Sequence, residues 1–281
     1  MNGQGWFAGL DQEETDTLVS RIRSSRGSIP KDWPSIAVEA DFVDDTQAYY
    51  SLLHDLAIEA AQAEITDRES AEDQQLIHAV RTLDALESTR NELGEQAIEW
   101  AHTHFSLESE EIQTLDTLQE RSVAGKFGQQ LNEFIETVQT LRDNRDELQT
   151  FIQRETPAIA PNLSLLAGPV LAARLIALAG GLEDLAKMPS STVQVLGAED
   201  ALFSHLQGEA PSPKHGIIYT HEYIRHTDIS NRGSAARAMA GKLSIAARID
   251  YYSGDIRPEL ADELDERIQQ IRNGGDGNGS S

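Results

Sequence analysis

The chain has 281 residues, of which 39% are hydrophobic, so it can bury one or two cores and disorder throughout is excluded. It contains no cysteine, which excludes a disulfide framework, a cysteine nucleophile and a thiolate metal or iron–sulfur site. Its 47 acidic residues outnumber the 23 basic ones, and the resulting net charge of −24 would repel nucleic acids and anionic membranes at moderate salt.

The first 40 residues are rich in residues that interrupt regular structure. Three glycines lie within the first nine positions, and Gly27, Pro30 and Pro34 follow with only short apolar runs between them. This pattern predicts a reduced N-terminal element over residues 1–40, small or partly ordered. No basic leader precedes an apolar stretch, and no run of 18 apolar residues occurs, so we expect a cytoplasmic protein without a membrane span.

Residues 41–157 form the second predicted region, a coiled-coil dimerisation arm. From Asp41 to His104 the chain contains no proline and a single glycine, Gly94. Apolar side chains recur there at alternating spacings of three and four, and a second such series precedes Pro157, which is the heptad pattern of packed helices. We therefore predict an antiparallel helical hairpin that pairs with a second copy through the seam Leu83, Leu86, Arg90, Leu93, Leu131, Phe134, Val138, Leu141 and Arg145.

Each heptad series carries one arginine in its apolar stripe, Arg90 in the first and Arg145 in the second. A polar residue buried at such a seam sets the register or the oligomeric state at some cost in stability. Alternatively, both side chains snorkel from a broad bundle face, with their charged ends in water. Either arrangement predicts an arm for interaction with another protein rather than a catalytic cavity.

Residues 158–272 are predicted to form a compact domain of helices rich in small residues. The segment LSLLAGPVLAARLIALAGG is apolar nearly all round and ends at Gly180 and Gly181, as a buried helix with a glycine cap does. We also predict helices for GAEDALFSHL, RGSAARAMAGKLSIAARIDYY and PELADELDERIQQIR, and a loop with at most one short extended piece for GEAPSPKHGIIYTHEYI. Residues 273–281 form a flexible tail. The predicted fold class is all-α.

Charge is unevenly distributed along the chain. Residues 187–257 contain eight basic and seven acidic residues, whereas residues 1–186 contain 13 basic and 34 acidic ones. If any surface meets an anionic partner, we expect it in this near-neutral segment. The segment also contains four of the eight histidines, but their spacings of ten, six and five match no zinc motif, so no metal site is expected.

The helix predicted over residues 232–252 could bind a phosphodiester backbone. Arg237, Gly241, Ser244 and Arg248 fall within about 60° of one another at the ~100° per residue of a helix. Two arginines flanking two small residues would let the backbone lie close, with a bidentate contact at each end. A solvated polar face would explain the same spacing.

Two shorter motifs could also bind an anion. Lys214 and His215 lie in a short turn before a glycine, and they could supply donors to a phosphate or a base edge. The alternative is a rigid turn with an incidental lysine. Ser190 and Ser191 could offer hydroxyl groups and a helix N-terminus to phosphate, or could simply cap that helix.

Motifs of enzyme active sites are absent from the sequence. It contains no Walker loop, no G-x-G-x-x-G and no G-x-S-x-G. An acid/base pair cannot be selected from 47 carboxylates. We therefore expect a protein that is not an enzyme.

The motifs PNLSLLAG, LAARLIALAGGLEDLAKMPSSTVQVLGAEDALFSHL, PSPKHGIIY and RGSAARAMAGKLSIAARIDYYSG carry a family resemblance. This run, from Pro161 to Gly254, closely resembles the Nop domain of the archaeal box C/D ribonucleoprotein scaffold, a relative of the eukaryotic nucleolar Nop proteins. Upstream, LIHAVRTLDALESTRNELGEQAIEWAHTHF is similar to the entry helix of that family's coiled coil. The resemblance extends from about Asp41 to the last predicted helix.

The resemblance implies a non-catalytic scaffold for RNA-guided 2′-O-methylation. Its partners would be a box C/D guide RNA, a kink-turn-binding protein of ribosomal type, fibrillarin and a second copy of the chain. The chain itself would need no cofactor, because fibrillarin holds S-adenosylmethionine. The expected residues that bind RNA or the kink-turn protein are Ser190, Ser191, Gln194, His205, Lys214, His215, Arg232, Arg237, Lys242 and Arg248. The alternative is a coiled-coil adaptor without direct RNA contact.

The chain departs from the family pattern at several positions. Asp200 and Ser204 stand where the family usually has a lysine and an arginine, and the lysine-rich tail of relatives is replaced by an acidic helix. The N-terminal portion is shorter, and the coiled-coil tip between Phe105 and Gly128 looks trimmed. These departures bear on the strength of RNA binding, on fibrillarin docking and on the geometry of the dimer.

The composition also suggests where the protein works. Only five of the 23 basic residues are lysines. Selection in a cytoplasm at molar salt would favour an acidic, lysine-poor chain without cysteine, because the short Debye length screens the repulsion between carboxylates. We therefore expect a halophilic source; the alternative is an ordinary acidic protein.

Overall fold

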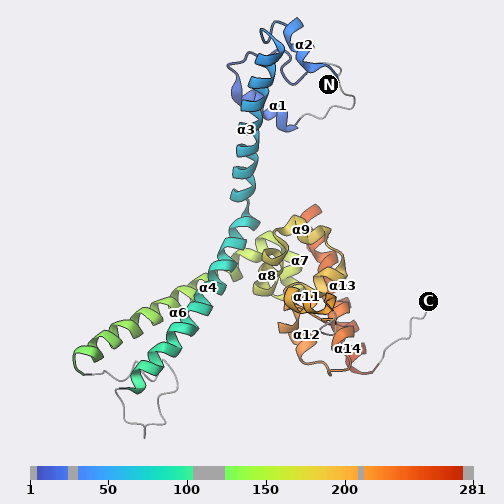
Figure 1. Ribbon diagram of the computed structural model, residues 1–281. Helices are drawn as coiled ribbons and strands as arrows, with labels where there is room; N and C mark the ends of the chain where they lie inside the picture. Colours follow the sequence, from blue (N-terminus) through green and yellow to red (C-terminus); the bar gives the residue numbers. More distant parts are fainter. Residues whose placement is uncertain (1–4, 25–30, 104–123, 208–211, 275–281) are drawn as a thin grey trace. The chain divides into compact units, whose positions relative to one another are not determined.

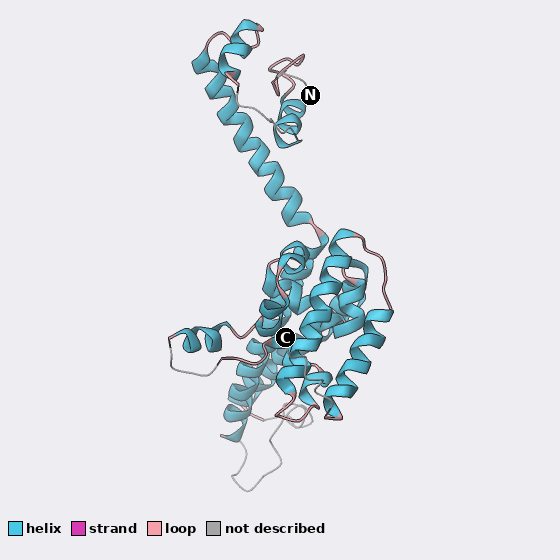
Figure 2. Cartoon of the chain, turned by 90° about the vertical axis from the view of Figure 1, so that its right-hand side faces the viewer, coloured by secondary structure: helices cyan, strands magenta, loops and turns pink. Residues whose placement is uncertain are grey.

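The computed structural model describes residues 5–24, 31–103, 124–207 and 212–274, and every regular element in these ranges is a helix (Figures 1 and 2). The predicted all-α fold class is confirmed. The chain divides into two compact units, Met1–Ala71 and Glu72–Ser281. This division falls inside the region 41–157 that was predicted to be one arm, because its first helix packs within the N-terminal unit.

The helices of the N-terminal unit are α1 (Thr15–Ser24), α2 (Trp33–Glu39) and α3 (Thr46–Ser70). Their shared core is an aromatic cluster in which Phe7, Phe42 and Tyr49 are buried. The Phe7 and Phe42 rings stack with centroids 5.2 Å apart, and such pairs stabilise a core beyond the area they bury. The unit therefore has a small core of its own.

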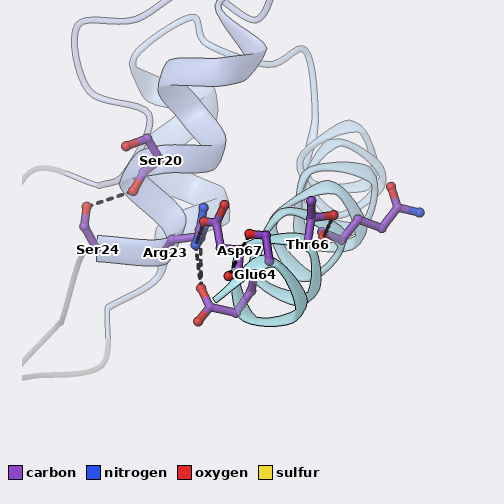
Figure 3. A network of polar contacts seen from close by, with 8 residues as sticks. Ser20, Arg23, Ser24, Glu64, Thr66 and Asp67 are labelled. Carbon is purple, nitrogen blue, oxygen red and sulfur yellow. Dashed lines mark hydrogen bonds and ion pairs between the residues drawn. The ribbon is translucent and has the colours of Figure 1, made fainter. Parts of the chain in front are cut away.

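Arg23, in the last turn of α1, joins this helix to α3 (Figure 3). One of its Nη atoms lies 2.7 Å from a carboxylate oxygen of Glu64 and 2.6 Å from one of Asp67. The hydrogen bonds that Arg23 donates to Asp67 and Glu64 raise the pKa of its guanidinium. Both carboxylates are exposed, so this contact orients the two helices more than it stabilises them.

The predicted hairpin consists of α4 (Glu72–His102) and α6 (Lys126–Ile159) (Figure 1). Its helices are antiparallel, because Leu83 and Ile152 share one buried cluster while Ala97 and Leu131 share another. Most of the predicted tip, residues 104–123, lies outside the described residues.

Three residues of the predicted dimer seam have a different role. Leu83 is 3% exposed and Leu131 and Val138 are fully buried within this single chain, so they hold the two helices of the hairpin together and cannot meet a second copy. The remaining six seam residues are half-buried: Leu86, Arg90, Leu93, Phe134, Leu141 and Arg145. The Nε atoms of Arg90 and Arg145 are buried without a hydrogen-bond partner.

Pro157, which follows the second heptad series, lies inside α6 and does not end it. The helix continues to Ile159, and Ala160 donates its N–H to the carbonyl of Thr156. Proline removes one intrahelical donor, the one that would bond to the carbonyl of Gln153. Because Gln153 is exposed, water can bond to that carbonyl and the last turn tolerates the proline.

The apolar segment predicted to be one helix is in fact two, α7 (Pro161–Ala167) and α8 (Pro169–Ala179). Gly168 has a φ of 75°, which breaks the helix, and Pro169 starts the next one. The predicted cap at Gly180 is confirmed, since that residue is left-handed with a φ of 91°. Among the described residues no single helix has the length and hydropathy to cross a membrane. Helices α7 and α8 have that length and hydropathy only when taken together, and the pair is bent by 117°.

The remaining helices are α9 (Leu182–Lys187), α10 (Ser190–Val195), α11 (Glu199–Leu206), the 3₁₀ helix η1 (Ile217–Thr220), α12 (Glu222–Arg225), α13 (Arg232–Tyr252) and α14 (Glu259–Arg272). The segment GEAPSPKHGIIYTHEYI, predicted to be a loop with at most one short extended piece, instead contains η1 and most of α12. Helix α13 is central: it packs on α7, α9, α10, α12 and α14. Its buried alanines allow these close approaches.

Buried polar contacts fix how this domain is assembled. Asp250 of α13 is buried and accepts hydrogen bonds from the N–H groups of Asn162 and Leu163, at 3.0 and 2.9 Å, at the start of α7. At the base of the hairpin, Arg174 of α8 lies 2.8 Å from a carboxylate oxygen of Asp84 on α4. The hairpin base and the C-terminal helices also share one apolar cluster, so they form a single unit.

Candidate functional site

The segment before η1 is held against the end of α10 by close backbone contacts. Gly216 donates its N–H to the carbonyl of Gln194 at 2.8 Å, and Gln194 Nε2 donates to the carbonyl of Lys214 at 2.7 Å. A Cβ at position 216 would lie only 2.0 Å from the carbonyl oxygen of Leu196, so only glycine fits there. Gln194, a predicted binding residue, therefore positions the Lys214 backbone.

Lys214 and His215 project from this anchored segment in different environments. Lys214 is exposed, whereas the half-buried His215 ring stacks on the Tyr219 ring at 20°, with centroids 4.5 Å apart. Burial lowers the pKa of His215, and the positive charges of Arg232 and Lys214 lower it further. His215 is therefore a neutral aromatic side chain at pH 7, beside an exposed cation.

Arg232, at the start of α13, is bonded to neighbouring protein groups. Its Nε donates to the carbonyl of Thr227 at 3.0 Å, one Nη to the hydroxyl of Tyr219 at 3.2 Å and the other to the carbonyl of Arg225 at 3.3 Å. Its guanidinium carbon also lies 5.4 Å from the centroid of the Tyr219 ring. The structure thus brings Lys214, His215 and Arg232 together around Tyr219, a residue that the sequence reasoning missed.

The stripe predicted along α13 is only partly available to a ligand. Ser244 is 3% exposed and donates to the carbonyl of Met188 at 3.2 Å, so the prediction that it faces a ligand is wrong. Its small side chain lets α13 pack closely on the segment between α9 and α10. Arg248 is exposed, but its Nε donates to the carbonyl of Ala186 at 3.2 Å. Arg237 is exposed.

Arg237 lines a groove of about 290 Å³ between α13 and α14. Arg267 of α14 lies on the same groove, and the apolar side chains of Ile245 and Leu264 also line it. Lys242 also lines it, and its ammonium pairs with Glu263. Sequence reasoning missed Arg267 because α14 is strongly acidic, and helical periodicity alone does not show which of its charges faces α13.

The other predicted residues lie on α10 and α11. Ser190 and Ser191 are exposed at the start of α10, where neither side chain caps the helix. His205 is half-buried on α11. On the same helix Ser204 donates its hydroxyl to the carbonyl of Asp200 at 3.0 Å, and Phe203 is 64% exposed. This helix presents an acidic first turn and an exposed aromatic ring rather than cations.

No group of three His, Asp or Glu side chains suited to a metal ion occurs in the part of the chain that the structure describes. One of the four histidines of the near-neutral segment has a structural role instead. His221 caps α12, with its Nδ1 accepting the N–H of Tyr223 at 3.2 Å. The exposed cations Lys214 and Arg237 and the half-buried ring of His215 are side chains of the kinds that contact phosphates and bases in nucleic acids.

The match to known proteins decides the family. A family model described as "Nop: snoRNA binding domain, fibrillarin" matches residues 41–270. The chain belongs to the Nop family. An uncharacterised NOP5 family protein of Methanocaldococcus jannaschii is 51% identical over 139 residues, which are 50% of this chain and 34% of that protein. Human nucleolar protein 56 is 39% identical over 140 residues, 50% of this chain and 24% of that protein.

A solved structure extends the likeness to the Nop fold. A chain in the crystal structure of a fibrillarin/Nop5p complex has a TM-score of 0.55 and 25% identity to this chain, covering 95% of this chain and 98% of that one. By contrast, the matched region is about a third or less of the length of the two curated Nop relatives. The structural match therefore spans almost the whole chain, whereas the sequence matches span only part of the two curated relatives.

Proposed function

We propose that this chain is a non-catalytic scaffold of the box C/D ribonucleoprotein, in which a guide RNA directs methylation of 2′-hydroxyl groups on a target RNA. The C-terminal helices bind the guide RNA together with its kink-turn-binding protein. The hairpin pairs with a second copy, and the N-terminal unit docks fibrillarin, which holds S-adenosylmethionine and transfers the methyl group. The chain itself uses no cofactor.

The proposal is supported above all by the family match over residues 41–270, whose description joins snoRNA binding to fibrillarin. The surface chemistry agrees with it. Lys214 and Arg237 are exposed cations in the near-neutral part of a very acidic chain, and His215 is a half-buried aromatic ring beside one of them. Exposed cations position a phosphate backbone, while aromatic rings stack on unpaired bases.

The acidic charge makes the kink-turn-binding protein necessary. A chain with a net charge of −24 repels free RNA at moderate salt, so a partner has to supply part of the attraction. Asp200 on α11 adds to this repulsion close to the predicted binding residue His205. We therefore expect the chain to bind the complex of RNA with that protein and to bind free RNA poorly.

Reconstitution tests the proposal. The full chain is mixed with a box C/D guide RNA, the kink-turn-binding protein, fibrillarin and labelled S-adenosylmethionine, and methyl transfer to a complementary target RNA is measured. We expect methylation only when all components are present, and none on a target with a 2′-deoxy position at the methylation site. Equal methylation without this chain would refute the scaffold role.

Crosslinking to RNA in the same mixture distinguishes the alternative. A coiled-coil adaptor without RNA contact would enter the complex through proteins alone. We expect crosslinks from the surface that carries Lys214 and Arg237. Assembly and methylation without any crosslink to this chain would favour the adaptor.

A further inference from the structure

The hydrogen bonds of Arg232 leave it poorly suited to the RNA contact that was predicted for it. A bidentate contact to phosphate uses two parallel N–H groups along one edge of the guanidinium. In Arg232 the Nε and both Nη atoms each donate already, to Thr227, Tyr219 and Arg225. The edge formed by Nε and one Nη is thus occupied by two backbone carbonyls, and the other Nη already bonds to the Tyr219 hydroxyl.

These bonds instead fix the aromatic ring that contacts His215. Arg232 bonds to the hydroxyl of Tyr219 and lies against its ring, and the Tyr219 ring stacks on the imidazole of His215. The backbone of His215 is held separately, because Gly216 and Ile217 both donate N–H groups to the end of α10 at 2.8 Å. The imidazole therefore has one face covered by Tyr219 and remains half-exposed.

We propose that Arg232 is a positioning residue, which holds Tyr219 against His215 so that the imidazole is a rigid stacking surface for an unpaired base of the RNA. This rests on the proposed RNA-binding function. The stack Arg232, Tyr219 and His215 replaces a direct contact between Arg232 and phosphate. Lys214, next to the stack and exposed, is left to contact the backbone.

The charge state of the stack agrees with a base as its ligand. Arg232 and Lys214 are the charged groups that face His215, and together with burial they lower its pKa. A neutral ring makes no ion pair with phosphate but stacks on any base, and such stacking depends little on salt. Loss of a phosphate contact, in contrast, changes the salt dependence of binding.

The test measures RNA capture by the full chain, with the kink-turn-binding protein bound to the RNA, over a series of KCl concentrations. Arg232→Lys keeps the charge but replaces three nitrogen donors with one nitrogen, which cannot reach all three acceptors. We expect it to weaken capture about tenfold, as expected for a displaced stacking ring. Its salt slope should equal that of the wild type. Arg237→Ala is the matched control: loss of a phosphate contact should make the slope shallower by about 0.7–0.9.

Two outcomes would overturn the proposal. One is a shallower slope in Arg232→Met, which would mean that Arg232 does contact phosphate. The other is unchanged capture by both Arg232 variants. If a variant at position 232 does not fold, Tyr219→Leu serves instead, since it removes the ring under His215 and should weaken capture without changing the slope. Unchanged capture by Tyr219→Leu would equally refute the stack.

A measurement without RNA separates this proposal from the proposed function. The pKa of His215 is read by NMR of its imidazole in the free, full chain. Arg232→Met should raise that pKa, because a nearby positive charge is lost, and an unchanged value would contradict the stack. If the wild type captures no RNA at all, the RNA function fails, while this readout still reports whether Arg232 orders the His215 environment.

Discussion

Gly216 lies where the segment before η1 meets the carbonyl oxygen of Leu196. A methyl group at this position would lie 2.0 Å from that oxygen, so Lys214 and His215 would have to move with the backbone. We expect Gly216→Ala to lower the free energy of unfolding by about 1–3 kcal/mol, as overpacking does. Urea unfolding measures this, and capture of the RNA complex should weaken in parallel.

Gly241 provides the control for that substitution. It lies in the interior of α13, and a Cβ there would meet no atom within 4 Å. Gly241→Ala should therefore raise the free energy of unfolding by roughly 0.5–1 kcal/mol, because alanine is the better helix former. If Gly216→Ala and Gly241→Ala destabilise the protein equally, the contact with Leu196 is not what constrains position 216.

His221 makes stability depend on pH. Its Nδ1 accepts the N–H of Tyr223, which requires an unprotonated nitrogen. Burial lowers the pKa of His221 below its ordinary 6.5, Arg272 lowers it further, and Glu222 and Asp265 oppose the shift. The unfolded chain takes up the proton first as pH falls, so this contribution is complete above about pH 6.5 and is lost progressively below it.

Urea unfolding between pH 7.5 and 5.5 measures that dependence, above the range in which ordinary carboxylates titrate. The wild type should lose stability toward pH 5.5. His221→Asn keeps a side-chain acceptor at the cap and cannot take up the proton, so its stability should change less over the same range. An identical pH dependence in both proteins would mean that another group is responsible.

At the scale of helices, the middle of the hairpin is incompletely packed within one chain. Leu86 and Leu141 are half-buried there, and the Nε atoms of Arg90 and Arg145 have no hydrogen-bond partner. A second copy that covers this surface would bury the remaining apolar area of Leu86 and Leu141 and so stabilise the hairpin. We therefore expect a homodimer through this part of the hairpin.

Sedimentation equilibrium at high salt tests the dimer. Leu86→Arg and Leu141→Arg place a charge on the half-buried surface and should shift the protein toward monomer. Thr89→Arg and Asn144→Arg are matched controls on exposed positions of the same two helices and should remain dimeric. A wild-type monomer at all concentrations would rule out the dimer.

Local patterns predicted much of the helical structure. Heptad spacing predicted the hairpin, and α13 runs over Arg232–Tyr252 as its apolar period indicates. The bend at Gly168 was missed because a continuous apolar run conceals a turn that the positive φ of one glycine produces. The bonds of Arg232 could not be predicted, since two of its three partner residues, Tyr219 and Arg225, precede it by 13 and seven positions, and α12 lies between Tyr219 and Arg232.

At the scale of the whole molecule, acidity dominates the expected response to salt. Repulsion among 47 carboxylates is strong at low ionic strength and screened within a few Å at 1 M. We expect the isolated chain to lose helicity in low salt, measured by circular dichroism during a KCl titration. A helical content that is unchanged from millimolar to molar KCl would indicate an ordinary acidic protein rather than a halophilic one.

The assembled particle should respond differently to the same titration. Binding of phosphate weakens by about 0.7–0.9 decades per decade of salt for each contact. With few exposed cations and an aromatic stack, this surface depends more on shape, stacking and protein contacts. The complex should therefore persist in molar KCl with a shallow slope, and a steep loss over that range would show that charge attraction dominates.

We propose that the surface carrying Lys214 and Arg237 binds RNA held by a kink-turn-binding protein. The most direct measurement is the affinity of the full chain for that RNA–protein complex, compared between the wild type, Lys214→Ala, Arg237→Ala and the double variant. Each single change should weaken binding by roughly 1–3 kcal/mol, as the loss of a charge-assisted contact does, and circular dichroism should show intact helices. Wild-type affinity in both single variants and the double variant, with the fold intact, would contradict RNA binding by this surface.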